Sequence, residues 1–434
     1  MKKMITLLLV AVLPLAFTVV SPAQEAPGTK KKVEPKEIIL SHQDLQLTEE
    51  AKQLYDFYFK IAIPKASVEK QNRLQHAQAL LLQASALASD EGLKNYLQVL
   101  SEDLGKKDFT SSSALWMGLN ERSLDFFIKY RRKQRRLDPY IVYYDNEASK
   151  ALVPLRNVAD QMLNELSVKR EYIDNLGRLM APIQVARLLY APSVRRFVLM
   201  APSEPVKQKR PGFKLLVFRN VSDAYFKDVL KPVAKELLVG AWAGAIDEEA
   251  FLRYVVLQKI CHYVGPVLVP DKTDDKVQTV SAALGKILPS LEIIKSHVLA
   301  ARCVPLLVKE KIIPQEDEKK LLAMYVTYLA DKLRHGPERK ANLPYLAQFN
   351  LLMQQGGIAY DIQKKRFYID IPGMKKALTK ISLDVLELIQ KGKAKAVKKF
   401  FDRSQEVPSE LEDIMATLSG MPLQIKMVTP EPSN

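Results

Sequence analysis

The stretch of residues 248–328 constrains the fold most, because almost all of it has the apolar periodicity of α-helix. Gly265-Pro266 ends one helix inside it, and residues 271–275 form a polar loop before the next. Only 16 of the 434 residues are glycine, which favours helix over turn-rich structure. Residues 213–218 and 366–371 have the pattern of strands. The sequence therefore predicts a mainly α fold with a minor β component, of the α+β class.

The N-terminus has the organisation of a secretory signal. Lys2 and Lys3 precede an apolar run over residues 4–20, and small residues follow it. Residues 1–23 are therefore predicted to be a signal peptide, and the protein is expected to be exported, either periplasmic or extracellular. Residues 24–45 are rich in Lys and Pro and cannot bury a core, so they are predicted to be a flexible linker.

The rest of the chain divides into two regions by its pattern. Residues 46–115 have helical periodicity and are predicted to form an N-terminal helical region. Residues 116–430 are predicted to be a larger region, with mixed strands and helices over residues 116–240 and 360–430 and helices over residues 241–359.

The net charge of +16 makes anionic partners plausible and includes a basic run at residues 129–136. We interpret that run as a solvated helix face. Residues 150–198 are also predicted to be helical. We expect no nucleic-acid partner for an exported chain, and an anionic surface of the cell envelope is the alternative that the charge favours.

Gln258, Lys259 and His262 lie near the end of the helix that stops at Gly265-Pro266. In a zincin helix, two histidines at positions i and i+4 bind zinc, and a glutamate beside the first acts as general base. His262 is the second histidine of such a pair. Gln258 holds the first ligand position and Lys259 holds the base position, so this pattern indicates a metallopeptidase helix that has lost its chemistry.

Several segments in order resemble the dipeptidyl peptidase III family of zinc metallopeptidases in its shorter bacterial form. The family helix His-Glu-x-x-His-Gly-x-Gly-Pro corresponds to Gln-Lys-Ile-Cys-His-Tyr-Val-Gly-Pro from Gln258. Its next helix, Leu-Glu-Glu-x-Lys-Ala-Asp, corresponds to Leu-Glu-Ile-Ile-Lys-Ser-His from Leu291. The family His-Gly-x-Ala-Asn becomes Glu-Arg-Lys-Ala-Asn from Glu338, followed by Gln-Phe-Asn from Gln348. Arg219-Asn220-Val221 and Met421-Pro422-Leu423 resemble two further family elements.

The resemblance implies a two-lobed scaffold with a central cleft and a zinc site that has been lost. The third zinc ligand of the family falls on Ile293, which cannot coordinate a metal, so His262 is the one ligand that remains. We therefore expect no catalytic residue and no cofactor. The leading interpretation is an exported, catalytically inactive homologue whose cleft binds a peptide or protein ligand, with Glu338 and Asn342 as candidate peptide contacts.

Two alternatives remain open. One is an active peptidase or hydrolase with a relocated metal held by His262, Glu292 and His297, whose side chains are all donor types. The other is a basic interaction protein of the cell envelope that uses its charged surface and not the cleft. Cys261 and Cys303 are the two cysteines of the chain, and the sequence leaves open whether they form a disulfide.

Overall fold

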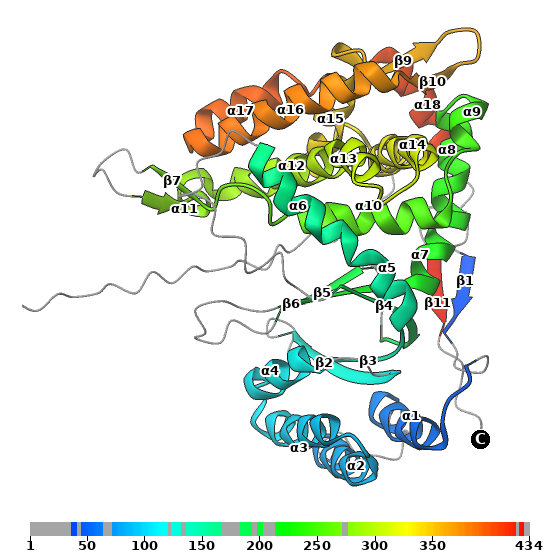
Figure 1. Cartoon of the computed structure of the whole chain (residues 1–434), viewed down its shortest axis with the longest axis vertical. Coiled ribbons are helices and arrows are strands. Elements are labelled where there is room, and N and C mark those ends of the chain that lie inside the picture. The colour runs from blue at the N-terminus through cyan, green and yellow to red at the C-terminus, as the bar shows by residue number, and fades with distance from the viewer. Residues whose placement is uncertain are drawn as a thin grey trace, which may run out of the picture.

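A computed structural model describes residues 36–40, 45–63, 72–119, 123–131, 136–165, 183–192, 198–202, 213–270, 277–421 and 425–428. The predicted signal peptide and most of the predicted linker lie outside these residues. Helices dominate, and strands make up one five-stranded sheet and three short pairs (Figure 1). The mainly α fold with a minor β component is therefore confirmed. No helix among the described residues has both the length and the apolar character needed to cross a bilayer.

The N-terminal helices pack together below the sheet in Figure 1. Asp90 begins one of them, because its side chain accepts a hydrogen bond from the backbone N–H of Leu93 at 2.6 Å. The apolar residues of the group face the sheet and one another. Its members are α1 (Glu49–Ala62), α2 (Arg73–Leu87), α3 (Glu91–Lys106) and α4 (Thr110–Gly118).

The central sheet has the strand order β2-β3-β4-β6-β5, and only its β4–β6 pair is parallel. Alternate residues of its inner strands enter different cores, as period-2 geometry requires. Leu216 and Phe218 join the core of the N-terminal helices, whereas Leu215 and Val217 join the core of the larger helical lobe. The strands are β2 (Leu124–Arg131), β3 (Arg136–Asp145), β4 (Ile183–Tyr190), β5 (Val198–Pro202) and β6 (Phe213–Phe218).

Two predictions about this region are wrong. The basic run at residues 129–136 was interpreted as a helix face, but its described part lies on the antiparallel strands β2 and β3. Residues 150–198 were expected to be helical throughout, but β4 and the start of β5 lie inside them. β4 is buried on both faces, so its apolar residues do not alternate and its sequence resembles that of a buried helix.

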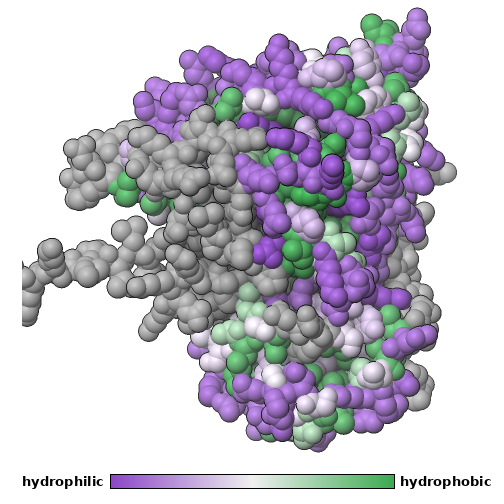
Figure 2. Space-filling model, in the orientation of Figure 1, coloured by the Kyte–Doolittle hydropathy of each residue, from purple (hydrophilic) through white to green (hydrophobic). Residues whose placement is uncertain are grey.

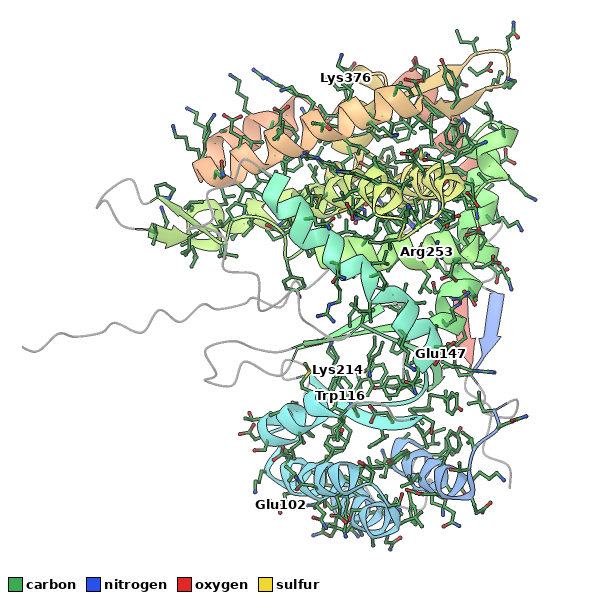
Figure 3. All side chains as sticks on the ribbon, viewed as in Figure 1. Glu102, Trp116, Glu147, Lys214, Arg253 and Lys376 are labelled. Atoms are coloured by element: carbon green, nitrogen blue, oxygen red, sulfur yellow. The ribbon has the colours of Figure 1, made fainter. Side chains whose placement is uncertain are left out.

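Lys214 joins the sheet to α4, although it is a lysine with no exposed surface (Figure 3). Its ammonium donates to the carbonyl of Leu119 at 2.5 Å and lies 4.5 Å from the ring centre of Trp116. Asp125 accepts from Trp116 Nε1 at 2.8 Å and from the hydroxyl of Tyr144 at 2.6 Å. These contacts attach one face of the sheet to the N-terminal helices.

A helical connection leads from the sheet to the larger lobe. Pro232 follows a π-helical turn, η3 (Phe226–Leu230). The wider turn accommodates the missing proline N–H without ending the helix. The elements of this connection are α5 (Asn146–Leu152), α6 (Pro154–Glu165), α7 (Arg219–Tyr225), α8 (Lys231–Leu237) and α9 (Gly240–Ala243).

The larger lobe is built around α10, α12 and α14, which pack against one another (Figure 1). Its long helices are α10 (Glu248–Cys261), α12 (Leu288–Arg302), α14 (Gln315–Leu333), α15 (Leu343–Gln354) and α16 (Ile371–Lys391). Its shorter helices are α11 (Val280–Leu284), the 3-10 turn η4 (Gly285–Ile287), α13 (Val304–Lys309), α17 (Ala394–Asp402) and α18 (Ser409–Leu418). Its strand pairs are β7 (Leu268–Pro270) with β8 (Val277–Thr279), and β9 (Ile358–Asp361) with β10 (Arg366–Ile369).

The two ends of the described chain meet in a parallel pair, β1 (Lys36–Ile39) with β11 (Ile425–Val428). The face shown in Figure 2 is largely hydrophilic over the helices of both lobes, with scattered apolar residues. The buried apolar residues form two clusters, so the molecule has two lobes, each with its own core. The central sheet contributes residues to both cores.

Candidate functional site

The helix α10 presents the residues that the sequence singled out. Asp247 starts it by accepting a hydrogen bond from the N–H of Ala250 at 2.7 Å. It ends at Cys261, and Gly265 follows with a φ of +116°, a conformation that side chains rarely adopt. A Cβ at Gly265 would also lie within 3.2 Å of Leu386 and 3.4 Å of Lys295. Gln258 and His262 are four residues apart and so lie on one face of the helix.

Gln258 connects this face of α10 to α12. Its amide nitrogen lies 2.8 Å from Nε2 of His262 and donates to the hydroxyl of Ser296 at 3.0 Å. Because an amide nitrogen only donates, His262 accepts at Nε2 and carries its ring proton on Nδ1. That Nδ1 atom is buried and has no hydrogen-bond partner among the described residues.

Lys295 makes the second connection between the two helices. Its ammonium, with a side chain that is 3% exposed, donates to the backbone carbonyl of His262 at 3.1 Å. It also pairs with Glu292 at 2.6 Å. The cation therefore pairs with a partly buried carboxylate and binds a carbonyl just beyond the end of α10. We call Gln258, His262, Lys295 and Ser296 together the α10–α12 junction.

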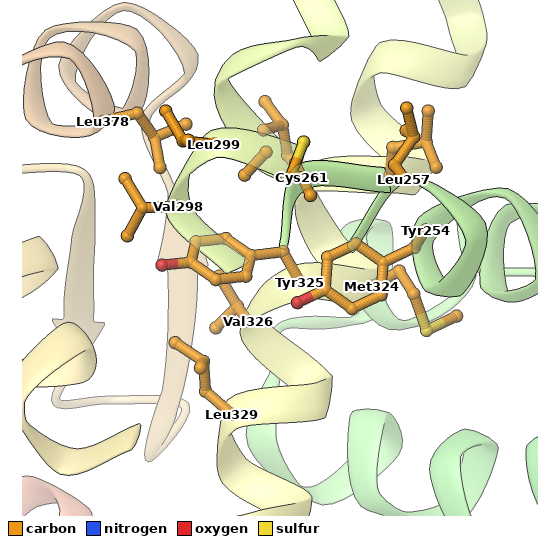
Figure 4. Close-up of a cluster of buried hydrophobic side chains, with 14 of the residues drawn as sticks. Tyr254, Leu257, Cys261, Val298, Leu299, Met324, Tyr325, Val326, Leu329 and Leu378 are labelled. Atoms are coloured by element: carbon orange, nitrogen blue, oxygen red, sulfur yellow. The ribbon is translucent and has the colours of Figure 1, made fainter. Parts of the chain in front are cut away.

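The apolar packing behind the junction is dense (Figure 4). Tyr254, Leu257 and Cys261 of α10 lie against Val298 and Leu299 of α12 and against residues of α14. This packing holds the two helices in register, so the polar residues at their ends meet at hydrogen-bonding distance.

The charge around His262 disfavours its protonated form. Burial lowers the pKa of His262 well below its usual value, and the nearby cations Lys259 and Lys295 lower it further. Lys259, at the base position, is half-buried. Ile293, at the third ligand position, packs its partly buried side chain against the core of the lobe.

His297 contacts aromatic side chains. Its Nδ1 is hydrogen-bonded to the hydroxyl of Tyr254, and its ring lies 5.3 Å from that of Tyr328 and 5.6 Å from that of Tyr345 between centroids. Burial and then Lys259 and Lys332 lower the pKa of His297 well below its usual value. The three donors of the relocated-metal hypothesis thus have separate protein partners. No group of three or more His, Cys, Asp and Glu side chains within the described ranges is arranged to hold a metal.

The side chains at the positions where a zincin helix binds zinc do not form a zinc donor set. Catalytic zinc takes three protein ligands and an open position for water. Here the first position is an amide that already donates to the remaining histidine, and the third is aliphatic. The residue at the base position is an ammonium, which repels a divalent cation. We therefore assign no chemical step to a metal at this junction.

The two candidate peptide contacts differ in environment. Glu338 is exposed, whereas Asn342 is nearly buried and donates to the carbonyl of Gly336 at 2.7 Å. Gly336 has a φ of +111°, so Asn342 stabilises the turn that leads into α15. Gln348 donates to Pro344 at 2.9 Å, and Asn350 donates to Ser404 at 3.1 Å and Glu406 at 2.7 Å.

Cys261 and Cys303 are buried free thiols. Burial and a hydrogen bond with Cys303 raise the pKa of the Cys261 thiol well above its usual value. The Cys303 sulfur also lies 3.3 Å from the sulfur of Met162. The structure therefore describes the reduced pair, with both thiols buried in the core of the larger lobe.

A buried ionic cluster at the end of α14 was not identified from the sequence. Asp331 has no exposed side-chain surface and accepts from Tyr225 at 2.5 Å, Lys332 at 2.7 Å and Arg334 at 2.9 Å. Burial alone would raise the pKa of Asp331, but Lys332 and then Arg334 hold it below its usual value. The sequence signal for this cluster is the adjacent pair Asp331 and Lys332. Such a pair is usually solvated, so it does not by itself predict a buried cluster.

The chain resembles known proteins in sequence and in fold. No family model matches the chain. Nudix hydrolase 3 of Arabidopsis thaliana is 22% identical over 370 residues, which are 81% of this chain and 47% of that protein. The chain thus spans about half the length of this curated relative.

Two solved structures resemble the chain over more than four-fifths of its length. DPP III from Caldithrix abyssi has a TM-score of 0.76 at 21% identity, covering 83% of this chain and 71% of that one. Dipeptidyl-peptidase III from Corallococcus sp. strain EGB has a TM-score of 0.70 at 20% identity, covering 82% and 68%. The chain therefore has the dipeptidyl peptidase III fold.

Proposed function

We propose that this protein is an exported, non-catalytic scaffold of dipeptidyl peptidase III fold that binds peptides. The observation that carries the proposal is Gln258, which occupies a ligand position and bonds both the remaining histidine and α12. In a zincin site, the metal joins the helices that supply its ligands. Here hydrogen bonds at corresponding positions join α10 and α12 without a metal.

Electrostatics support the loss of catalysis. At about 4 Å and an effective dielectric of about 20, an ammonium and a divalent cation repel each other by roughly 8 kcal/mol. A general base must accept a proton at neutral pH, which an ammonium does not do. Lys259 and Lys295 both act on His262, so the site is electropositive where a zincin site requires a carboxylate.

Peptides are the ligand class that the fold favours. Among the described strands, β2 and β5 are the outer strands of the five-stranded sheet. An outer strand can pair with an extended peptide backbone, which gives affinity with little dependence on sequence. The apolar segment at residues 4–20, which lies outside the described residues, supports export.

The test measures metal content, dipeptide release and peptide binding on one preparation of the purified chain. We expect substoichiometric zinc, no dipeptide release, and peptide binding that is unchanged by a chelator. The matched control is Gln258→His/Lys259→Glu/Ile293→Glu, which restores the ligand and base residue types and should gain zinc binding. Stoichiometric zinc in the natural chain, together with dipeptide release that a chelator abolishes, would overturn the proposal. Failure to bind any member of a random peptide library would contradict the proposal that the protein binds peptides.

A further inference from the structure

The segment of residues 391–403 concentrates positive charge. Its net charge is +5 over thirteen residues, from one acid, Asp402, and six cations: Lys391, Lys393, Lys395, Lys398, Lys399 and Arg403. A run of like charges of this length is usually a solvated surface or an interaction surface. The exposure of these charges and their pairing with acids decide between a solvated surface and an interaction surface.

The helix α17 orients the charges to one side. Val397 and Phe401 are buried in the core of the larger lobe, which fixes the rotation of the helix. The six cations of the segment are all exposed. Figure 3 shows nitrogen-tipped side chains projecting outward from α16 and α17. The arrangement is therefore a rigid basic face and not a flexible tail.

Most of these charges have no acidic partner. Lys391 pairs with Glu387, and Lys398 pairs with Asp402 at 2.8 Å. Lys393, Lys395, Lys399 and Arg403 form no ion pair with any described residue. The turn η4 packs against α17 and adds Lys286, which is exposed and likewise has no ion pair within the described ranges. We call Lys286, Lys393, Lys395, Lys399 and Arg403 the α17 face.

The composition of the α17 face indicates the kind of partner. Lysine is depleted at the centre of protein–protein interfaces, which need apolar or aromatic anchors. Single-stranded nucleic acid is held by exposed aromatic rings, but Phe401 is buried and Phe400 is half-buried. A bilayer of acidic lipids needs neither anchors nor rings, because it attracts clustered lysines through its surface potential.

We propose that the α17 face docks this protein onto the surface of a bilayer that contains acidic phospholipids. The face is distinct from the α10–α12 junction, so docking and peptide binding are separate properties. Each lysine near an acidic bilayer contributes about fivefold to the partition coefficient, so three contribute about a hundredfold.

The test is sedimentation of the full chain with vesicles of phosphatidylcholine alone or with phosphatidylglycerol added. The patch variant is Lys393→Gln/Lys395→Gln/Lys399→Gln. The control is Lys52→Gln/Lys94→Gln/Lys106→Gln, which removes the same charge from lysines of α1 and α3 that each pair with an acid one turn away on the same helix. Both variants keep the apolar N-terminal segment, so its insertion would affect them equally.

We expect the natural chain to bind only the acidic vesicles, the patch variant to lose about a hundredfold and the control to stay within about threefold. Binding should weaken strongly between 0.1 M and 1 M salt, as the screening length falls from about 10 Å to about 3 Å. Circular dichroism confirms that both variants are folded. Equal loss in the two variants would contradict the proposal, and so would binding to a single-stranded oligonucleotide without binding to acidic vesicles.

Discussion

At the residue scale, the Gln258 amide determines the hydrogen bonding at the end of α10. Its nitrogen donates to both His262 and Ser296, which leaves the histidine neutral and engaged. An amide has a fixed donor and a fixed acceptor, so this geometry holds one tautomer of the ring. The one amide nitrogen therefore joins the end of α10 to α12 through two hydrogen bonds.

Replacing Gln258 with Ala should destabilise the protein by about 1–3 kcal/mol, because His262 Nε2 would lose its partner in a buried position. The control Gln354→Ala removes an exposed glutamine from α15 and should change stability by less than about 0.5 kcal/mol. Urea unfolding of the two variants measures the difference. An equal effect in both would show that the junction contributes nothing to stability.

At the element scale, helices and strands with clear local signals were predictable, and those defined by long-range packing were not. Asp90 before a helix and the strand at residues 213–218 follow from local capping and pattern. The strand β4 was predicted as helix because burial on both faces removes its alternation. Similarly, the Gln258–Ser296 contact joins residues 38 positions apart and has no local signature.

The Asp331 cluster ties α7 to the end of α14. Replacing Asp331 with Asn should cost about 3–5 kcal/mol, because Lys332 and Arg334 would remain charged without their carboxylate. The control Asp384→Asn breaks the exposed pair with Lys380 and should cost at most about 1 kcal/mol. Thermal unfolding of both variants distinguishes them. A neutral result at Asp331 would mean that the cluster is solvated in solution.

At the scale of the whole molecule, three neutral histidines make stability depend on pH. Burial is the largest cause that lowers the pKa of His262, His297 and His335, the last to about 4. Since the unfolded chain binds these protons near pH 6.5 and the folded chain does not, the stabilisation is complete above that pH and is lost as pH falls.

Stability should therefore be constant near pH 7 and decline below about pH 6.5, by about 1.4 kcal/mol per pH unit for each histidine that protonates only on unfolding. His335→Gln should make the decline shallower between about pH 6.5 and pH 5, because the unfolded chain would then bind one proton fewer in this range. Chemical unfolding across this pH range measures both slopes. A decline of the same slope in the variant would contradict the assignment of His335.

The pairing of β1 with β11 joins residues 36–39 to residues 425–428. The strand β1 therefore lacks its β11 partner until residues 425–428 have been synthesised. Completion of this strand pair is postponed until then. The late pairing agrees with the proposed export, because translocation channels accept polypeptides that have not yet folded.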